Sequence, residues 1–219
     1  LRALLCSVDH CTFHEVGGTG VAVAGFGPGS RDQNGYHSIC GNQFTEIGTL
    51  WIHSSAIFLS QSSNCRIAHN HISECHYCGI VLSGLRAPLF TERSDRDTEG
   101  PRTIRWDEVG ANPKTWDTLL GFLHSRNNVI EHNEVHSVMK TLGDGNGIYL
   151  SGTGFGNIVR RNHVHHILGD GAVAAIRADD YQYFASFTEN VVHDCRCSGF
   201  ITKGINEFTN NIVVDCTRD

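Results

Sequence analysis

The stretch Asn162-His163-Val164-His165-His166-Ile167 decides the fold, because its pattern recurs along the chain. The pattern is Asn, any residue, an apolar residue, usually two polar residues and a second apolar residue, with another apolar residue three positions before the Asn. Seven copies start at anchor residues 21 to 31 residues apart, with one interval of 63: Cys11, Asn42, Asn70, Asn133, Asn162, Asn190 and Asn211. Positions that are apolar in every copy predict equivalent core positions in stacked repeats, and the recurring anchor Asn predicts an internal ladder of amides.

A second apolar run follows each of the first six anchors after a turn of variable length. It begins nine residues after most anchors, as in Gly79-Ile80-Val81-Leu82 and Gly171-Ala172-Val173-Ala174, and fourteen residues after two of them, at Ala56 and Gly147. Short apolar runs with Gly or Asn in the turns, and no helical periodicity between them, predict a parallel β-solenoid. A leucine-rich repeat would need a leucine ladder that this sequence lacks. We therefore expect an all-β fold of about seven stacked coils.

The interval of 63 residues places a long inserted loop within residues 86–126. This segment is highly charged and carries Trp106 and Trp116, so it fits either a lid over a neighbouring groove or a solvated surface loop. The last repeat stops at Asp219, before its second apolar run begins. We expect residues 1–219 to form a single domain of a longer chain, with additional segments that cap the solenoid.

Composition and charge narrow the function classes. The chain has 40% hydrophobic and 18% charged residues, a formal net charge of -6 and a pI near 6.1. These values are typical of a globular domain and argue against nucleic acid as a partner, which would favour a basic surface. No apolar stretch is long enough for a membrane span, and the short apolar start of the chain lacks the features of a signal peptide.

The nine cysteines and fourteen histidines raise the question of a metal site. Cys75, Cys195 and Cys216 occupy the apolar position five residues after an anchor, so we interpret them as reduced, buried thiols rather than zinc ligands. The position three residues after the anchor is His in four copies, three of them consecutive: His14, His136, His165 and His193. Stacked imidazoles can bind a metal ion, but an outward ladder of histidines needs none, and we predict no metal site.

Two repeated turns carry the sharpest chemical signal. Leu142-Gly143-Asp144-Gly145 recurs one coil later as Leu168-Gly169-Asp170-Gly171. If the two turns stack in register, Asp144 and Asp170 lie close together on one face, and we predict them as a catalytic pair. Paired carboxyl groups are what glycoside hydrolysis needs, because one protonates the leaving oxygen and the other acts as nucleophile or base. The alternative is that an Asp between two glycines only forms a turn.

Candidate substrate contacts surround this pair. Counting from Gly147 and Gly171 places Tyr149 opposite Val173, in an outward column that is apolar in the other copies. An outward apolar column indicates that a loop or a ligand covers it. Charged and aromatic residues stand near the same strands or in their turns, and we predict the following as substrate-binding residues: Tyr149, Arg177, Asp179, Asp180, Lys203 and Trp51.

Residues 13–21, 70–75, 129–136 and 142–149 resemble the right-handed parallel β-helix repeat proteins of the pectate-lyase-like superfamily, and more narrowly the bacterial β-helical glycoside hydrolases. The resemblance covers nearly all of the chain outside the insertion. It implies a right-handed coil, a polysaccharide or oligosaccharide as partner, a secreted, periplasmic or cell-surface location, and a site role for the Asp144 of Gly-Asp-Gly-Asn-Gly-Ile-Tyr. The superfamily includes hydrolases, lyases and non-catalytic proteins, so the fold does not assign the chemistry.

Three functional interpretations therefore stand side by side. The first is a carbohydrate-active enzyme, a glycoside hydrolase that works through Asp144 and Asp170 without a cofactor. The second is a polysaccharide lyase, in which an Arg or a calcium ion neutralises a uronate carboxylate and a base such as Lys203 or His136 removes the α-proton. The third is a non-catalytic tailspike or adhesin segment that binds glycans or spaces other domains.

Overall fold

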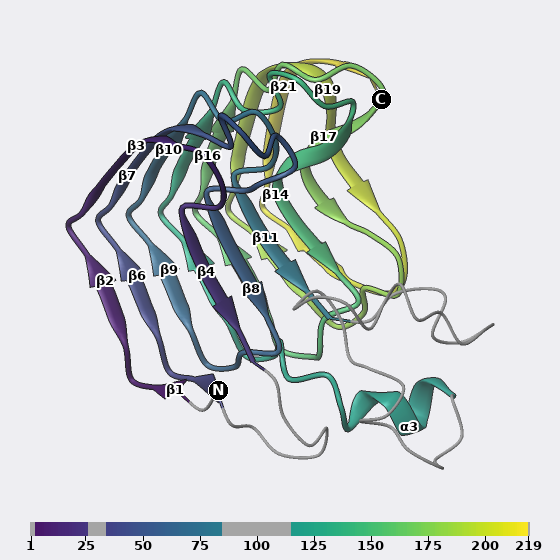
Figure 1. Cartoon of the computed structure of the whole chain (residues 1–219). Coiled ribbons are helices and arrows are strands. Elements are labelled where there is room, and N and C mark those ends of the chain that lie inside the picture. The colour runs from purple at the N-terminus through teal and green to yellow at the C-terminus, as the bar shows by residue number, and fades with distance from the viewer. Residues whose placement is uncertain (1–2, 26–33, 85–114, 219) are drawn as a thin grey trace.

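The computed structural model describes residues 3–25, 34–84 and 115–218. These residues wind into a solenoid, and each complete coil has three strand segments that meet at three corners (Figure 1). Every strand pair in these ranges is parallel, and each strand pairs with the equivalent strand of the next coil. The predicted right-handed parallel β-helix of seven coils is confirmed.

Three rows of strands form the walls of the solenoid. The first row is a seven-stranded sheet made of β2 (Ser7–Asp9), β6 (Ser38–Cys40), β9 (Arg66–Ala68), β12 (Val129–Glu131), β15 (Ile158–Arg160), β18 (Ser186–Thr188) and β20 (Glu207–Thr209). The other two rows are arms of one twelve-stranded sheet. The first arm contains β3 (Thr12–Val16), β7 (Gln43–Ile47), β10 (His71–Ser73), β13 (Glu134–His136) and β16 (His163–His165). The second arm contains β4 (Val21–Ala24), β8 (Ile57–Ser60), β11 (Ile80–Ser83), β14 (Asp144–Ser151) and β17 (Ala172–Ala178).

One long strand joins the two arms. Strand β19 (Val191–Thr202) pairs with β16 through its first half and with β17 through its second half. Strand β21 (Ile212–Arg218) pairs with β19 and belongs to the last coil. Two short strands, β1 (Ala3–Leu4) and β5 (Asn34–Gly35), form a separate pair.

Apolar side chains stack inside the coils as the sequence predicts. Val135, Val164 and Val192 are partners in register and are fully buried. Val213 continues the same column but is 47% exposed, because it lies in the last described coil. Such uninterrupted apolar stacking supplies most of the favourable free energy of a solenoid.

A ladder of amides lines the corner between the seven-stranded sheet and the first arm. The Nδ2 group of each anchor Asn donates to the Oδ1 atom of the Asn in the next coil at 2.9–3.0 Å, along the series Asn42, Asn70, Asn133, Asn162, Asn190 and Asn211. Each Nδ2 group also donates to a backbone carbonyl of the preceding coil, as Asn133 does to Ile67. The expected internal amide ladder is confirmed.

A second, shorter amide ladder stands at the corner that precedes the seven-stranded sheet. Asn128 donates from Nδ2 to the Oδ1 atom of Asn157 at 3.1 Å, and its own Oδ1 accepts from the backbone N–H of Cys65 at 2.9 Å. This ladder was not predicted from the sequence, because the equivalent positions of other coils hold residues such as His37 and Ala185.

The corner between the two arms has the same backbone shape at its start in every coil. The residue four positions after each anchor has a φ angle between 51° and 57°, and these residues are Glu15, Glu46, Glu74, Ser137, His166, Asp194 and Asp215. Asp and His tolerate this left-handed conformation better than most residues, although Glu also adopts it here. The position is thus a corner of the coil, which explains why polar side chains occupy it.

None of the nine cysteines, all of which lie in the described ranges, forms a disulfide bond. Cys75 and Cys195 are buried, as predicted, and burial raises the pKa of the Cys75 thiol to about 12. Cys216 is only half-buried, because the last described coil has no neighbour on its outer side.

Only part of the predicted insertion lies among the described residues. Residues 115–126 include the short helix α3 (Trp116–Leu120), whereas Trp106 lies outside the described residues. After the helix, the Ser125 hydroxyl donates to the Ser83 carbonyl at 2.7 Å and accepts from the Gln61 backbone N–H at 2.8 Å, so the chain returns to the second arm. The lid function stays a prediction. In the three described ranges, no helix is long and apolar enough to cross a membrane.

Candidate active site

The second arm carries most of the residues that the sequence singled out, but its register differs from the predicted one. Tyr149 lies opposite Arg177, not opposite Val173. The prediction failed because the run after Gly171 pairs with the first half of the long strand β14, where Val173 is the partner of Gly145. The correction places Arg177 next to Tyr149 in the outward column.

The predicted pairing of Asp144 with Asp170 is wrong in register. Asp144 is the strand partner of Ala172, so Asp170 lies two positions earlier in its own coil. The carbonyl of Gly143 accepts a hydrogen bond from the Ala172 N–H at 3.0 Å, which fixes this offset. Both aspartates are exposed, but they do not stack as equivalent residues of neighbouring coils.

A cluster of charged groups forms around a different carboxylate, that of Asp179. The Tyr149 hydroxyl donates to its Oδ2 atom at 2.6 Å, and Arg177 donates from Nη2 to its Oδ1 atom at 3.0 Å. The ammonium group of Lys203 lies 2.7 Å from the same Oδ1 atom and 2.6 Å from the Oδ1 atom of Asp180. The structure therefore brings together four of the predicted substrate contacts around Asp179.

The guanidinium of Arg177 connects this cluster to Asp144. Its Nη1 atom lies 3.3 Å from the Oδ1 atom of Asp144 and 2.9 Å from the carbonyl oxygen of Ala172, to which it donates. Asp179 and Arg177 are only 6% and 8% exposed, whereas the side chain of Asp144 is 83% exposed. Arg177 thus contacts both the buried carboxylate of Asp179 and the exposed carboxylate of Asp144.

Burial and the contacts within the cluster shift the pKa values of its side chains and so determine their charges. Burial alone would raise the pKa of Asp179, but hydrogen bonds from Lys203 and Tyr149 and the charge of Arg177 outweigh it, and the pKa is lowered. Burial and the hydrogen bond to Asp179 raise the pKa of Tyr149. Hydrogen bonds to Asp179 and Asp180 raise the pKa of Lys203. At neutral pH, Asp179 is therefore ionised, Tyr149 is neutral and Lys203 is charged.

A buried row of hydroxyl groups leads to the cluster along the second arm. Ser60, Ser83 and Ser151 are partners in register and are all buried. Within the described part of the chain, neither the Oγ atom of Ser60 nor the Nε atom of Arg177 has a hydrogen-bond partner. Unsatisfied polar atoms of this kind are uncommon in folded proteins, and they mark places where a ligand or a water would be favourable.

In the described ranges, the side chains of Trp51 and Asp170 make no hydrogen bond or ion pair with the cluster. Trp51 lies in the turn before β8, where its backbone N–H donates to the Gly17 carbonyl at 2.8 Å, and it is 70% exposed. This turn is two coils away from β14, which corresponds to about 10 Å along the solenoid. Trp51 stays a candidate for contact with an extended ligand.

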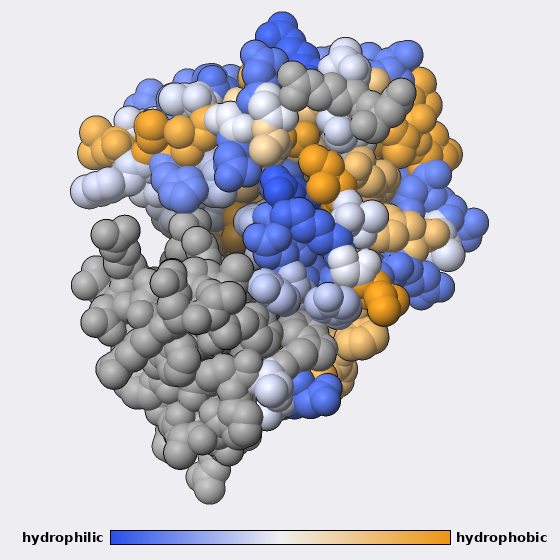
Figure 2. Space-filling view, turned by 90° about the vertical axis from the view of Figure 1, so that its right-hand side faces the viewer, coloured by the Kyte–Doolittle hydropathy of each residue, from blue (hydrophilic) through white to orange (hydrophobic). Residues whose placement is uncertain are grey.

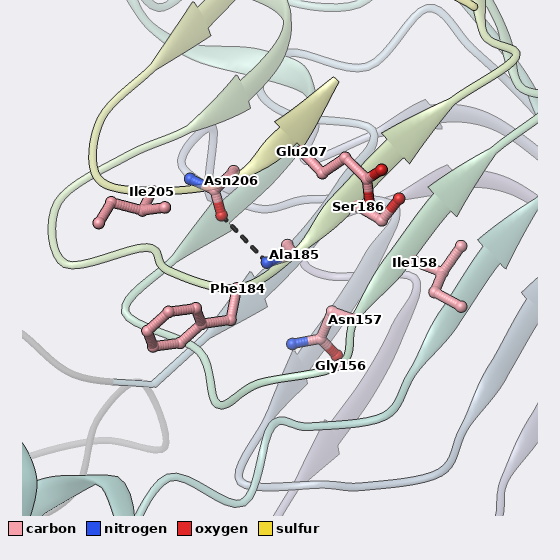
Figure 3. Close-up of a pocket in the computed structure, with 9 residues that line it drawn as sticks. All are labelled: Gly156, Asn157, Ile158, Phe184, Ala185, Ser186, Ile205, Asn206 and Glu207. Atoms are coloured by element: carbon pink, nitrogen blue, oxygen red, sulfur yellow. Dashed lines mark hydrogen bonds between the residues drawn. The ribbon is translucent and has the colours of Figure 1, made fainter. Parts of the chain in front are cut away.

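A groove that the sequence analysis missed lies at the corner after the second arm (Figure 3). Its volume is about 370 Å³. Phe184 and Ile205 are exposed beside the amides of Asn157 and Asn206, with the carboxylate of Glu207 further along (Figure 3). The sequence feature that could have indicated this groove is the recurrence of polar and aromatic residues five and six positions before the anchors.

The groove and the cluster belong to the same turn of chain. Asn206 donates from Nδ2 to the carbonyl of Lys203 at 3.0 Å, and its Oδ1 accepts from the Ala185 N–H at 3.1 Å. On the side of the molecule shown in Figure 2, the described hydrophobic and hydrophilic residues lie intermixed.

Comparison with solved structures finds the same architecture in a protein described as a "Glycoside hydrolase", with a TM-score of 0.58 and 21% sequence identity. The match covers 94% of this chain but 32% of that protein, so the chain spans about a third of its length. What the two share is the fold. No protein-family profile matches the chain, and no curated protein matches its sequence.

Proposed function

We propose that the chain carries the active site of a carbohydrate-active enzyme, a glycoside hydrolase that cleaves a polysaccharide or oligosaccharide. The observation that carries the proposal is the Arg177 guanidinium, which contacts the carboxylates of both Asp144 and Asp179. Two carboxyl groups in different environments are the basic requirement of glycoside hydrolysis. The catalytic pair proposed here is Asp144 with Asp179, in place of Asp144 with Asp170.

The environments of the two carboxyl groups suggest their roles. Asp179 is buried and kept ionised by three donors, which suits a nucleophile or a base that activates water. Asp144 stands at the exposed edge of the cluster, where a bound sugar can reach its carboxyl group. This accessible position suits the group that donates a proton to the leaving oxygen, so we assign Asp144 the role of general acid. The proposed hydrolysis uses water and no cofactor.

Neighbouring groups provide the substrate contacts in this proposal. Lys203 and Asp180 are half-exposed beside Asp179 and can exchange their ion pair for hydrogen bonds to sugar hydroxyls. The groove beside Phe184 supplies an exposed ring on which a sugar can stack, with the amide of Asn206 near it (Figure 3). A groove of about 370 Å³ is large enough for one or two sugar rings.

The lyase alternative has weaker support from the geometry. A lyase base must accept a proton, yet the hydrogen bonds of Lys203 raise its pKa and burial raises the pKa of Tyr149. His136, the other candidate base, lies on the first arm, and its hydrogen bonds go to His71 and Ser137 instead of the Asp179 cluster.

The experiment that tests the proposal is a polysaccharide panel assayed with the purified protein. Each reaction is read for new reducing ends and for the absorbance of unsaturated products. A hydrolase gives reducing ends without that absorbance, a lyase gives both, and a non-catalytic glycan-binding protein gives neither. The second and third results would each overturn the proposal.

A further inference from the structure

The outward face of the first arm carries a second cluster of chemically active side chains. His71, Glu134 and His163 are strand partners on β10, β13 and β16. Two positions further along, His136 and His165 are partners in the next outward column. Only the second of these columns repeats one residue type in consecutive copies of the sequence pattern, so the carboxylate between the histidines was not predicted.

Glu134 is the centre of this cluster. Its Oε1 atom lies 3.3 Å from Nε2 of His165 and 3.9 Å from Nδ1 of His163, and its Oε2 atom lies 3.9 Å from Nε2 of His71. One ligand atom each from Glu134, His163 and His165 can be chosen so that all three lie within 4.8 Å of one another. Four-coordinate zinc at about 2.0–2.2 Å from N and O ligands needs separations of roughly 3.3–3.6 Å between them. Small side-chain rotations would bring the three atoms into that range.

The other nitrogen of each ring has a partner that fixes its direction. His163 makes a hydrogen bond from Nε2 to His193 at 2.7 Å, which leaves Nδ1 facing Glu134. His165 makes one from Nδ1 to His166 at 2.7 Å, which leaves Nε2 facing Glu134. Metal-binding histidines in proteins are oriented in this way by a hydrogen bond from the second ring nitrogen.

Stacking holds the central imidazole from both sides. The ring of His165 lies between those of His136 and His193, with centroids 4.9 Å and 5.0 Å away and interplanar angles of 9° and 2°. A ring stacked on both faces loses little further rotational freedom when it binds a ligand. The cluster is therefore preorganised around Glu134.

We propose that Glu134, His163 and His165 form a binding site for a divalent transition-metal ion of the zinc type. Two imidazoles and one carboxylate are a ligand set that zinc accepts, and the fourth position is left to water or to His71. The ion would connect β13 to β16, which belong to neighbouring coils, and so stabilise the solenoid. This site lies on the first arm, away from the Asp179 cluster, and does not depend on the proposed function.

Two other groups in the described ranges bring potential ligands together, and they make useful controls. His166, His193 and Asp194 form one, but the Asp194 carboxylate already accepts from His193 at 2.7 Å and lies at the exposed corner. His14, Glu15 and Glu46 form the other, which offers only one imidazole. Neither group has a carboxylate surrounded by three imidazoles.

The test is a calorimetric titration of the chelator-treated protein with zinc chloride, repeated with cobalt and followed by visible absorption. We expect one equivalent to bind, with a cobalt spectrum typical of four-coordination. Glu134→Gln should weaken binding at least tenfold. Glu46→Gln, from the separate His14, Glu15 and Glu46 group, is the matched control and should bind like the wild type. Asp194→Asn tests the neighbouring group. Circular dichroism of each variant checks the fold, and His163→Gln provides a second ligand variant if Glu134→Gln does not fold.

The outcomes decide the proposal. No stoichiometric binding by the wild type would overturn it, as would unchanged binding by a folded Glu134→Gln or His163→Gln variant. Loss of binding in Asp194→Asn alone would move the site to the neighbouring group and also overturn it.

Discussion

The two arms of the large sheet use the same coil in different ways. On the first arm, five residues follow each anchor with the same spacing in all seven coils, and the corner residue has nearly the same φ angle throughout. On the second arm, the turn before each strand varies in length, and β14 and β17 extend into it. The candidate active site lies on the arm with the variable turns. The regular repeats form the scaffold, and the segments that depart from the repeat position the candidate active-site residues.

Removing the carboxylate at the centre of the second-arm cluster should have the largest effect. Asp179→Asn should lower kcat/KM on a cleavable glycoside on the order of 10³-fold, because the nucleophile or base is lost. His136→Gln, a first-arm control, should retain the activity. Equal losses in the two variants, measured by steady-state kinetics, would remove the functional distinction between the arms.

The amide ladder should contribute most to the free energy of unfolding in the middle of the solenoid. Asn133→Ala should lower the free energy of unfolding by about 2–3 kcal/mol, because it leaves buried donors and acceptors of two neighbouring coils without partners. Asn211→Ala, in the last described coil, should cost less, since Asn211 is only half-buried. Urea unfolding of both variants measures the difference, and equal losses would contradict a ladder whose contribution depends on burial.

The ion contacts of Asp179 should make stability depend on pH. Its pKa is lowered in the folded protein, so the contacts with Arg177, Lys203 and Tyr149 stabilise the fold above the unfolded pKa near 3.8. This stabilisation is lost as the pH falls through the lower folded value. The difference in free energy of unfolding between wild type and Asp179→Asn should therefore shrink as the pH falls from about 5 to about 2, around and below the unfolded pKa. A difference that stays constant over this range would argue against an ionised, paired Asp179.

A substitution inside the first-arm core should have the smallest effect. Cys195 occupies a position that other coils fill with Val or Ile, and its thiol is free. Cys195→Val should change the free energy of unfolding by less than about 1 kcal/mol, because volume and apolarity are roughly conserved. Thermal and urea unfolding provide the measurement. A loss several times larger would show that the thiol has a role beyond packing.

The same contrast between the arms explains what the sequence could predict. The Asn anchors and the apolar positions around them predicted the coils, the amide ladder and the stacking of Val135, Val164 and Val192. Those predictions rest on fixed spacings, which stacking preserves. The register of β17 could not be counted from Gly171, because the turn residues Asp144 and Gly145 join β14 and pair with Ala172 and Val173. Residue types at the site were predictable, but their grouping around Asp179 depended on that register.

The central claim is that Asp144 belongs to the active site through Arg177 and that its sequence twin Asp170 does not. Turnover of one cleavable glycoside by Asp144→Asn and by Asp170→Asn tests this most directly, because the two aspartates stand in identical Leu-Gly-Asp-Gly sequences but in different structural positions. We predict that Asp144→Asn loses at least 99% of the turnover, on the order expected for a general acid, and that Asp170→Asn retains the wild-type rate. Full activity in Asp144→Asn, or an equal loss in Asp170→Asn, would contradict the account.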